Sequence, residues 1–299
     1  MITAEKVSKR FGRYDAVKDV SIHVKKGSIY GLLGSNGAGK TTFLKMVTGI
    51  IRPDQGITKV EEVPVYENPK TKERVLFIPD QPYFFQQATL MQMSAFYEKV
   101  YERWNGGRFR QLYEHFSLDP HRKLSRMSKG MQRQAAFILT LSVMPDVLVL
   151  DEPFDGLDPV IRQQVKNLLI QDVSEREMTI LVSSHNLREM EDFCDSVGVM
   201  HKGGLLFERD LEELKTDVCK VQVAFRKMPD PSFLDGMNVL HDEKRGRVLT
   251  CIVRGQEEEI YRYVQTFEPA IFDILPLTLE EIFTYEMGSV GYEIRNLIV

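Results

Sequence analysis

The most constraining feature of the sequence is residues 34–41, GSNGAGKT, which match the pattern G-x-x-x-x-G-K-[ST] without a mismatch. A short apolar run at residues 27–33 precedes this segment, and residues 41–49 have a helical pattern. The sequence therefore predicts a strand, a glycine-rich loop and a helix in succession. In such a loop the backbone N–H groups can turn inward around an anion, toward which the following helix directs its positive end. The segment predicts a phosphate-binding loop in an α/β fold.

Two side chains of this loop have expected roles in binding a nucleotide. Lys40 is placed to reach the β- and γ-phosphate oxygens, and Thr41 offers its hydroxyl to Mg²⁺. A structural turn before a helix is the alternative, but the flanking strand and helix favour phosphate binding. The expected phosphate-binding residues are Gly34, Ser35, Asn36, Gly37, Ala38, Gly39, Lys40, Thr41 and Thr42.

A pair of carboxylates follows a second buried strand. Residues 147–150 are consecutively apolar, as in strands buried on both faces of a parallel sheet, and they deliver Asp151 and Glu152 to the strand's carboxyl end. Asp151 is suited to hold Mg²⁺ through its water shell, and Glu152 to orient and deprotonate an attacking water. An acidic turn before Pro153 is the alternative, and the upstream phosphate loop favours the catalytic interpretation.

The rest of the first two thirds predicts an α/β architecture. Alternating apolar positions at residues 1–7 and 16–24 indicate a pair of strands in an antiparallel β-subdomain. Residues 86–145 are rich in Met, Gln, Arg and aromatic side chains at helical spacing, so we expect a helical subdomain there. The apolar runs 147–150 and 179–182, separated by a helix-length segment, predict a βαβ unit.

A second domain is expected at the C-terminal end. The strand pattern restarts near residue 218, so we divide the chain into residues 1–217 and a small α+β domain at 218–299, regulatory or dimerising. Thr278 followed by Glu281 fits a capping box at the start of a last helix. The tail 288–299 carries no motif.

Composition excludes several classes of function. A formal charge of −4 over 299 residues provides no general basic field, so no nucleic-acid partner is expected. The three cysteines, Cys194, Cys219 and Cys251, are widely spaced and favour a reducing compartment over disulfides or zinc. No signal segment and no run of about 18 apolar residues occurs, so we expect membrane contact only through another protein.

Residues 127–134, MSKGMQRQ, resemble the signature of ABC ATPases in the form typical of export-type subfamilies. Ser128 can cap a helix there, and Gly130 lets a phosphate approach the helix N-terminus. Met127 and Lys129 depart from the usual Leu and Gly, but the position, about twenty residues before Asp151, supports the resemblance. The expected signature residues, which act on the partner subunit's ATP, are Ser128, Lys129, Gly130, Met131 and Gln132.

The resemblance to ABC transporter ATP-binding proteins implies further roles. His185 would contact the γ-phosphate as a second catalytic residue beside the glutamate, and Phe11 would stack on adenine. Asp158 would lie at the subunit interface. Asp80, or the adjacent Gln81, would contribute to the Mg²⁺ site. A packed aromatic or a structural histidine is the alternative for Phe11 or His185 taken alone.

The aromatic residues Tyr83, Phe84 and Phe85 leave two interpretations open. They are either buried under the helical subdomain, or they shape a groove that receives a coupling helix from the membrane subunit.

The resemblance also implies a mechanism. Two such subunits, as a homodimer or a heterodimer, would close head to tail around two Mg-ATP and drive a polytopic membrane subunit. Transport is then powered by ATP hydrolysis at the cytoplasmic face of the cell membrane, with export favoured. The alternatives are a soluble ABC-type ATPase of translation or DNA repair, which the single core and missing heptads disfavour, and a sensing or resistance module controlling a membrane partner.

Overall fold

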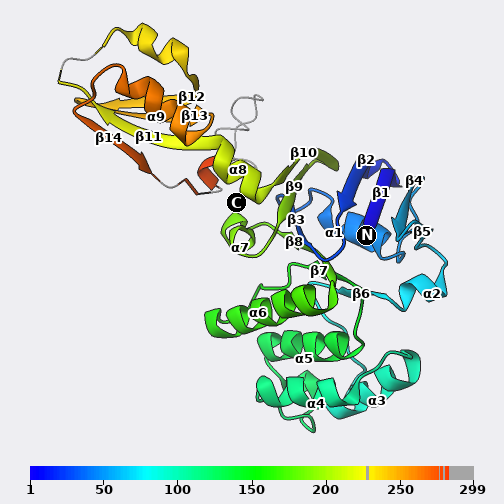
Figure 1. Ribbon diagram of the computed structural model, residues 1–299. Coiled ribbons are helices and arrows are strands. Elements are labelled where there is room, and N and C mark those ends of the chain that lie inside the picture. The colour runs from blue at the N-terminus through cyan, green and yellow to red at the C-terminus, as the bar shows by residue number, and fades with distance from the viewer. Residues whose placement is uncertain (227–228, 276, 279, 283–299) are drawn as a thin grey trace. The chain divides into compact units, whose positions relative to one another are not determined.

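The computed structural model describes residues 1–226, 229–275, 277–278 and 280–282 (Figure 1). It divides into two compact units, the first comprising Met1–His185 and Gly198–Glu208, and the second Asn186–Val197 and Arg209–Val299. The division after residue 217, expected from the sequence, stays a prediction. The tail 288–299, for which we had found no motif, lies outside the described residues.

The first unit contains an antiparallel sheet with the strand order β2-β1-β4-β5. Its strands are β1 (Ile2–Phe11), β2 (Tyr14–Val24), β4 (Gln55–Val60) and β5 (Val63–Pro64). Ile2 pairs with Val24 at one end of the β1–β2 hairpin, and Phe11 pairs with Tyr14 beside its two-residue turn. The predicted β-subdomain is confirmed. Phe11, the residue predicted to stack on adenine, is the last residue of β1, next to this turn.

The central sheet of this unit has six strands in the order β10-β9-β3-β8-β7-β6. They are β3 (Ile29–Leu33), β6 (Val75–Ile78), β7 (Val147–Asp151), β8 (Thr179–Ser184), β9 (Ser196–His201) and β10 (Gly204–Asp210). Strand β3 pairs in parallel with β8, β8 with β7, and β7 with β6. Every residue of β3, β7 and β8 is buried, which explains their continuous apolar runs. Their carboxyl ends therefore meet at one edge.

Helices connect several strands of this sheet in the first unit (Figure 1). Helix α1 (Lys40–Val47) follows β3 and buries Phe43, Leu44 and Met46 in the core. The short helix α2 (Pro69–Lys72) precedes β6, and α6 (Pro159–Arg176) joins β7 to β8. Parallel neighbours joined by a helix form the predicted βαβ arrangement.

The predicted helical subdomain consists of α3 (Leu90–Val100), α4 (Gly106–His115), a 3₁₀ turn (Leu124–Arg126) and α5 (Lys129–Ser142). Figure 1 shows these helices together, and α5 contacts both α3 and α4. Each α-helix begins at a side-chain cap, supplied in order by Thr89, Asn105 and Ser128. These caps are local, so the sequence specifies where each helix begins.

The second unit contains a four-stranded antiparallel sheet with the order β12-β13-β11-β14. Its elements are α7 (Leu187–Glu191), α8 (Leu211–Asp217), β11 (Val218–Ala224), a 3₁₀ segment (Pro231–Gly236), β12 (Asn238–Arg245), β13 (Val248–Arg254), α9 (Glu257–Gln265) and β14 (Ile271–Leu275). Val221, Cys251 and Val253 on one face of the sheet form a core with Ile260 and Val264 of α9. This core belongs to the second unit alone.

The capping box predicted near the C-terminal end of the described residues is present. Thr278 N donates to Glu281 Oε2 at 3.0 Å, and Glu281 N donates back to Thr278 Oγ1 at 3.3 Å.

Candidate functional site

The glycine-rich loop joins β3 to α1 and borders a cavity of about 280 Å³. Gly37 and Gly39 have φ angles of 81° and 105°, and a side chain at Gly39 would collide with the Ala16 carbonyl. The cavity is lined by Tyr14, Ala16, Ser35, Asn36, Gly37, Ala38, Gly39, Lys40, Thr41, Thr42, Asp80, Asp151 and Glu152. All but one of the expected phosphate-binding residues thus share one cavity with the carboxylate pair.

Gly34, the remaining residue of that set, contacts the lysine of the loop. Lys40 Nζ donates to Gly34 O at 2.5 Å and lies 3.1 Å from Glu152 Oε1, with the lysine side chain only 6% exposed. A buried ammonium group is costly unless it is paired, so these contacts hold it at the base of the loop. Phosphate oxygens entering the cavity would meet a positive charge already in place.

The residues predicted to hold Mg²⁺ contact one another at the carboxyl end of β7. Thr41 Oγ1 donates to Asp151 Oδ2 and Ser183 Oγ donates to Asp151 Oδ1, each at 2.7 Å. A hydroxyl and a carboxylate are the hard oxygen ligands that Mg²⁺ prefers, and Asp80 lines the same cavity. The donor set therefore fits Mg²⁺.

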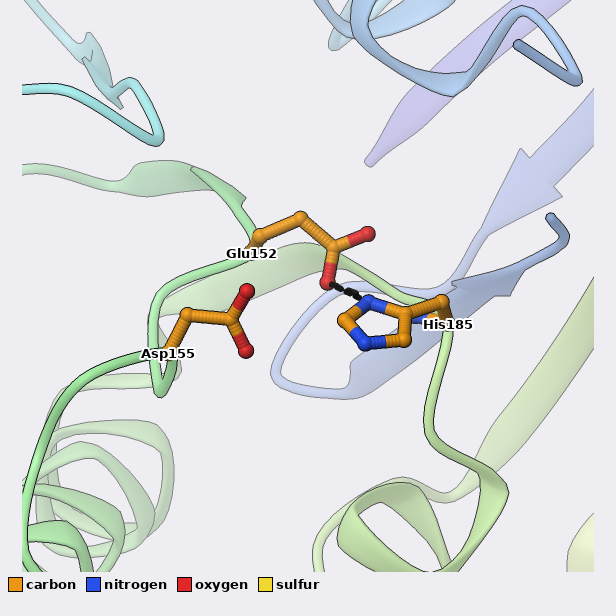
Figure 2. A group of neighbouring side chains, drawn as sticks. All are labelled: Glu152, Asp155 and His185. Atoms are coloured by element: carbon orange, nitrogen blue, oxygen red, sulfur yellow. Dashed lines mark hydrogen bonds and ion pairs between the residues drawn. The ribbon is translucent and has the colours of Figure 1, made fainter. Parts of the chain in front are cut away.

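Glu152 points toward His185 (Figure 2). His185 Nδ1 lies 2.9 Å from Glu152 Oε2, and the backbone N–H of His185 donates to the same oxygen at 3.3 Å. Glu152 has a left-handed backbone with φ 46°, a conformation that a glutamate rarely adopts and that costs on the order of 1 kcal/mol. This turn directs the carboxylate to a position between Lys40 and His185, where it can accept a proton.

Asp155 adds a second carboxylate to this group. Glu152 and Asp155 extend from the loop after β7 and His185 from the end of β8, and one donor atom of each lies within 4.8 Å of the others. The sequence prediction did not include Asp155, because it belongs to no motif and reaches the histidine only through the meeting of two strand ends.

Arg133 was also missed from the sequence, although it contacts two predicted site residues, Glu152 and Asp80. It is 7% exposed, and its guanidinium donates to the backbone oxygens of Glu152 at 2.7 Å and Asp155 at 2.5 Å. It also donates to Asp80, to Oδ1 at 2.9 Å and to the backbone oxygen. The available signal was its position at the start of an apolar helical run, since every residue from Arg133 to Ser142 is buried. An arginine on a buried helix face needs acceptors.

The carboxylate of Asp80 is half-exposed, while the neighbouring Gln81 is exposed and does not line the cavity. Whether Asp80 or Gln81 serves the metal stays a prediction, with the geometry favouring Asp80.

The signature segment lies at the N-terminus of α5, and none of its five residues lines the cavity. Ser128 Oγ accepts the N–H of Met131 at 3.2 Å, as expected of a cap. A Cβ on Gly130 would lie 3.1 Å from the Gly156 carbonyl, so the segment packs closely on the turn after β7. Asp158, the predicted interface residue, caps α6 by accepting the N–H groups of Val160 and Ile161.

The two aromatic residues of the β1–β2 hairpin differ in position. Tyr14 lines the cavity and donates its hydroxyl to Gly37 O at 3.0 Å. Phe11, predicted to stack on adenine, does not line this cavity and is 49% exposed, with Lys9 Nζ 5.7 Å from its ring centroid. The stacking role of Phe11 stays a prediction.

The segment after β6 carries exposed aromatic side chains. Tyr83 is 82% exposed and Phe85 is 47% exposed, while Phe84 is partly buried. Burial under the helical subdomain therefore does not account for Tyr83 or Phe85. Within the described residues, no helix has the length and apolar character to cross a membrane.

A loop that directs a lysine and a threonine toward phosphate, beside two carboxylates at the end of a buried parallel strand, defines the class of P-loop nucleotide hydrolases. The model of the ABC transporter family matches residues 17–155. The ABC transporter ATP-binding protein YtrB of Bacillus subtilis is 31% identical over 97% of this chain and 99% of its own length. The bacitracin transport ATP-binding protein BcrA of Bacillus licheniformis is 33% identical over 72% of this chain and 71% of its own.

The fold is also shared with solved structures. The dimeric cassette MJ0796, bound to ADP and Pi, has a TM-score of 0.65 at 20% identity and covers 71% of this chain and 99% of its own. At this identity the likeness shows the fold alone.

The chain belongs to the family of ABC transporter ATP-binding proteins. It is an ATP-binding and ATP-hydrolysing subunit that uses ATP with Mg²⁺. The names of these relatives support a transporter subunit over a soluble ATPase of translation or DNA repair.

Proposed function

We propose that this subunit powers export through a separate polytopic membrane subunit, and that it is bound to the cytoplasmic face of the membrane through that partner. Support comes from the relative BcrA, which is named for bacitracin transport, and from the export-type form of the signature segment. The observation that carries the ATPase mechanism is the position of Glu152, between Lys40 and His185.

In this mechanism the loop residues 34–42 bind the phosphates of ATP. Thr41 and Asp151 would hold Mg²⁺, with Asp80 lining the same cavity, and the bound ion would supply positive charge to the phosphate oxygens. Glu152 orients the attacking water and takes its proton, and His185 keeps the carboxylate in place. Lys40 stabilises the charge that builds on the γ-phosphate as the bond to the leaving group breaks.

The separation of the two nucleotide-facing elements supports a dimer. Because Ser128 and Gly130 do not line the chain's own cavity, their anion-binding helix terminus needs an ATP held by another subunit. MJ0796, whose fold this chain shares, is dimeric. Two subunits closing head to tail would place each signature segment over its partner's ATP, with Asp158 at the interface.

Glu152→Gln tests this mechanism. Loss of the proton acceptor should lower the ATPase rate by roughly 10²- to 10⁴-fold, while ATP binding persists because the loop is unchanged. The variant should then accumulate as an ATP-dependent dimer, visible by size-exclusion chromatography with light scattering. Hydrolysis at the wild-type rate would remove Glu152 from the mechanism. Co-purification from the native membrane tests the partner: a polytopic membrane protein supports transport, and a signalling protein supports a sensing module.

A further inference from the structure

Arg133 is the described side chain that ties the signature helix to the hydrolysis site of the same chain. Its guanidinium contacts Asp80 after β6 and the backbone of Glu152 and Asp155 after β7. We propose that Arg133 is a positioning residue that couples ATP bound at the signature segment to the alignment of this chain's own Glu152. The proposal rests on the proposed function, because the ATP at the signature segment belongs to the partner subunit.

The contacts need an arginine. One terminal nitrogen donates to the two backbone oxygens of the β7 loop, and the other donates to the backbone oxygen and to Oδ1 of Asp80. A planar guanidinium can serve two diverging sets of acceptors at once, whereas the ammonium of a lysine is a single point donor on a flexible stem. The arginine side chain is 8% exposed, so a guanidinium that loses these acceptors is left buried and unpaired, although the Asp80 carboxylate itself is half-exposed.

The signature cap and Arg133 belong to one rigid element. Ser128 caps α5, and Arg133 lies five residues further along, roughly 7.5 Å at 1.5 Å per residue. Because the helix moves as a body, a shift of its N-terminus toward a partner's ATP must also move the guanidinium. Because the guanidinium is hydrogen-bonded to the backbone oxygen of Glu152, this movement also shifts Glu152, whose carboxylate lies 2.9 Å from His185.

The hydrogen bonds of Arg133 do not involve the phosphate loop. In the described contacts of Arg133, its acceptors are on Asp80, Glu152 and Asp155, and none is on residues 34–42. Loss of Arg133 should therefore leave ATP binding nearly unchanged and affect the turnover step and its dependence on the second ATP. A purely structural role would instead lower stability and affinity together.

The experiment compares Arg133→Gln and Arg133→Lys with the wild-type full chain, and Arg110→Gln provides the matched control. Arg110 is exposed on α4, so its substitution makes the same charge change away from the site. The measurements are the ATP dissociation constant, kcat, and the Hill coefficient of ATPase activity against ATP concentration. We expect kcat to fall about 10- to 100-fold in both Arg133 variants, and the Hill coefficient to fall from above 1 toward about 1. Arg110→Gln should match the wild type.

Several results would overturn the proposal. These are a wild-type Hill coefficient of 1, an unchanged Hill coefficient in the variants, or full activity of Arg133→Lys. If Arg133→Gln does not fold, judged by circular dichroism, Arg133→Lys decides the question, since it keeps the charge and most of the volume. Failure of the proposed function would be recognised separately. In that case the wild-type chain would not hydrolyse ATP, and the Glu152→Gln variant would not dimerise in the presence of ATP.

Discussion

Adjacent residues at the end of β7 have different surroundings. Asp151 is buried and accepts hydrogen bonds from Thr41 and Ser183, whereas Glu152 turns toward Lys40 and His185. The left-handed backbone at Glu152 separates the two directions. One carboxylate therefore suits a metal and the other suits proton transfer, which is the division of roles that the sequence predicted.

The two aromatic residues of the β1–β2 hairpin, Phe11 and Tyr14, lead to separate predictions for nucleotide binding. If Phe11 stacks on adenine, Phe11→Ala should weaken ATP binding by about 1–3 kcal/mol, the usual value of stacking on a base. Tyr14→Phe removes one exposed hydrogen bond to Gly37, so it should cost no more than about 1 kcal/mol. Isothermal titration with ATP measures both. If Tyr14→Phe weakens ATP binding more than Phe11→Ala does, the contact with the nucleoside is made by Tyr14 and not by Phe11.

The ionisation of Cys251 leads to predictions about its reactivity and about the stability of the second unit. Burial, with a smaller effect of Asp242, raises the pKa of this thiol from 9.0 to about 12. At pH 8 the buried thiol should therefore resist alkylation, unlike the partly exposed Cys194. Between about pH 9 and about pH 12 the Cys251 thiol ionises in the unfolded chain but not in the folded one. The free energy of unfolding of this unit should therefore fall as pH rises from about 9 toward about 12. Iodoacetamide labelling read by mass spectrometry, with a urea-unfolded control, checks the first point; rapid labelling of Cys251 in the folded chain would contradict it.

At the scale of elements, a buried ion pair joins α4 to α6. Asp172 accepts from Arg108 at 2.5 Å and from Arg176 at 2.9 Å, and its side chain is 2% exposed. Asp172→Asn leaves two arginines without their anion, so it should lower the free energy of unfolding by about 3–5 kcal/mol. Urea unfolding measures this change.

Glu175→Gln is the control for this prediction, since Glu175 is an exposed carboxylate on the same helix. Its cost should stay within about 0.5 kcal/mol. Equal stability of both variants would show that the α4–α6 ion pair contributes little to the fold.

The elements that could be predicted were those with a strong local pattern. Strands β7 and β8 are buried on both faces and therefore read as continuous apolar runs. Strand β12 was missed because its residues from His241 to Arg245 are exposed and polar, and only pairing with β13 makes them a strand.

At the scale of the whole molecule, an exposed apolar patch indicates a docking surface. Tyr83, Phe85, Met91, Phe96 and Val100 are exposed on neighbouring segments of the chain, and the rings of Phe85 and Phe96 are in edge contact at 4.8 Å. We call these five residues the apolar patch. It lies on the first unit, on α3 and the segment that follows β6 and Asp80. We propose that it receives a coupling helix of the membrane subunit.

Tyr83→Ser combined with Phe85→Ser should reduce transport in reconstituted vesicles much more than ATPase activity, because neither residue lines the nucleotide cavity. Tyr261→Ser in the second unit, also at an exposed aromatic residue, is the control. Unchanged coupling of transport to hydrolysis in the double variant would refute the docking role.

The sequence by itself determined the phosphate loop, the carboxylate pair, the helix caps and the signature segment, because each depends on spacing within a few residues along the chain. Only the tertiary structure brought His185 to Glu152, Thr41 to Asp151, and Arg133 to three site residues. These contacts depend on which strands are neighbours and on how α5 packs, and such pairings of distant segments leave no local pattern in a single sequence. Asp155 and Arg133 belong to the site for that reason alone.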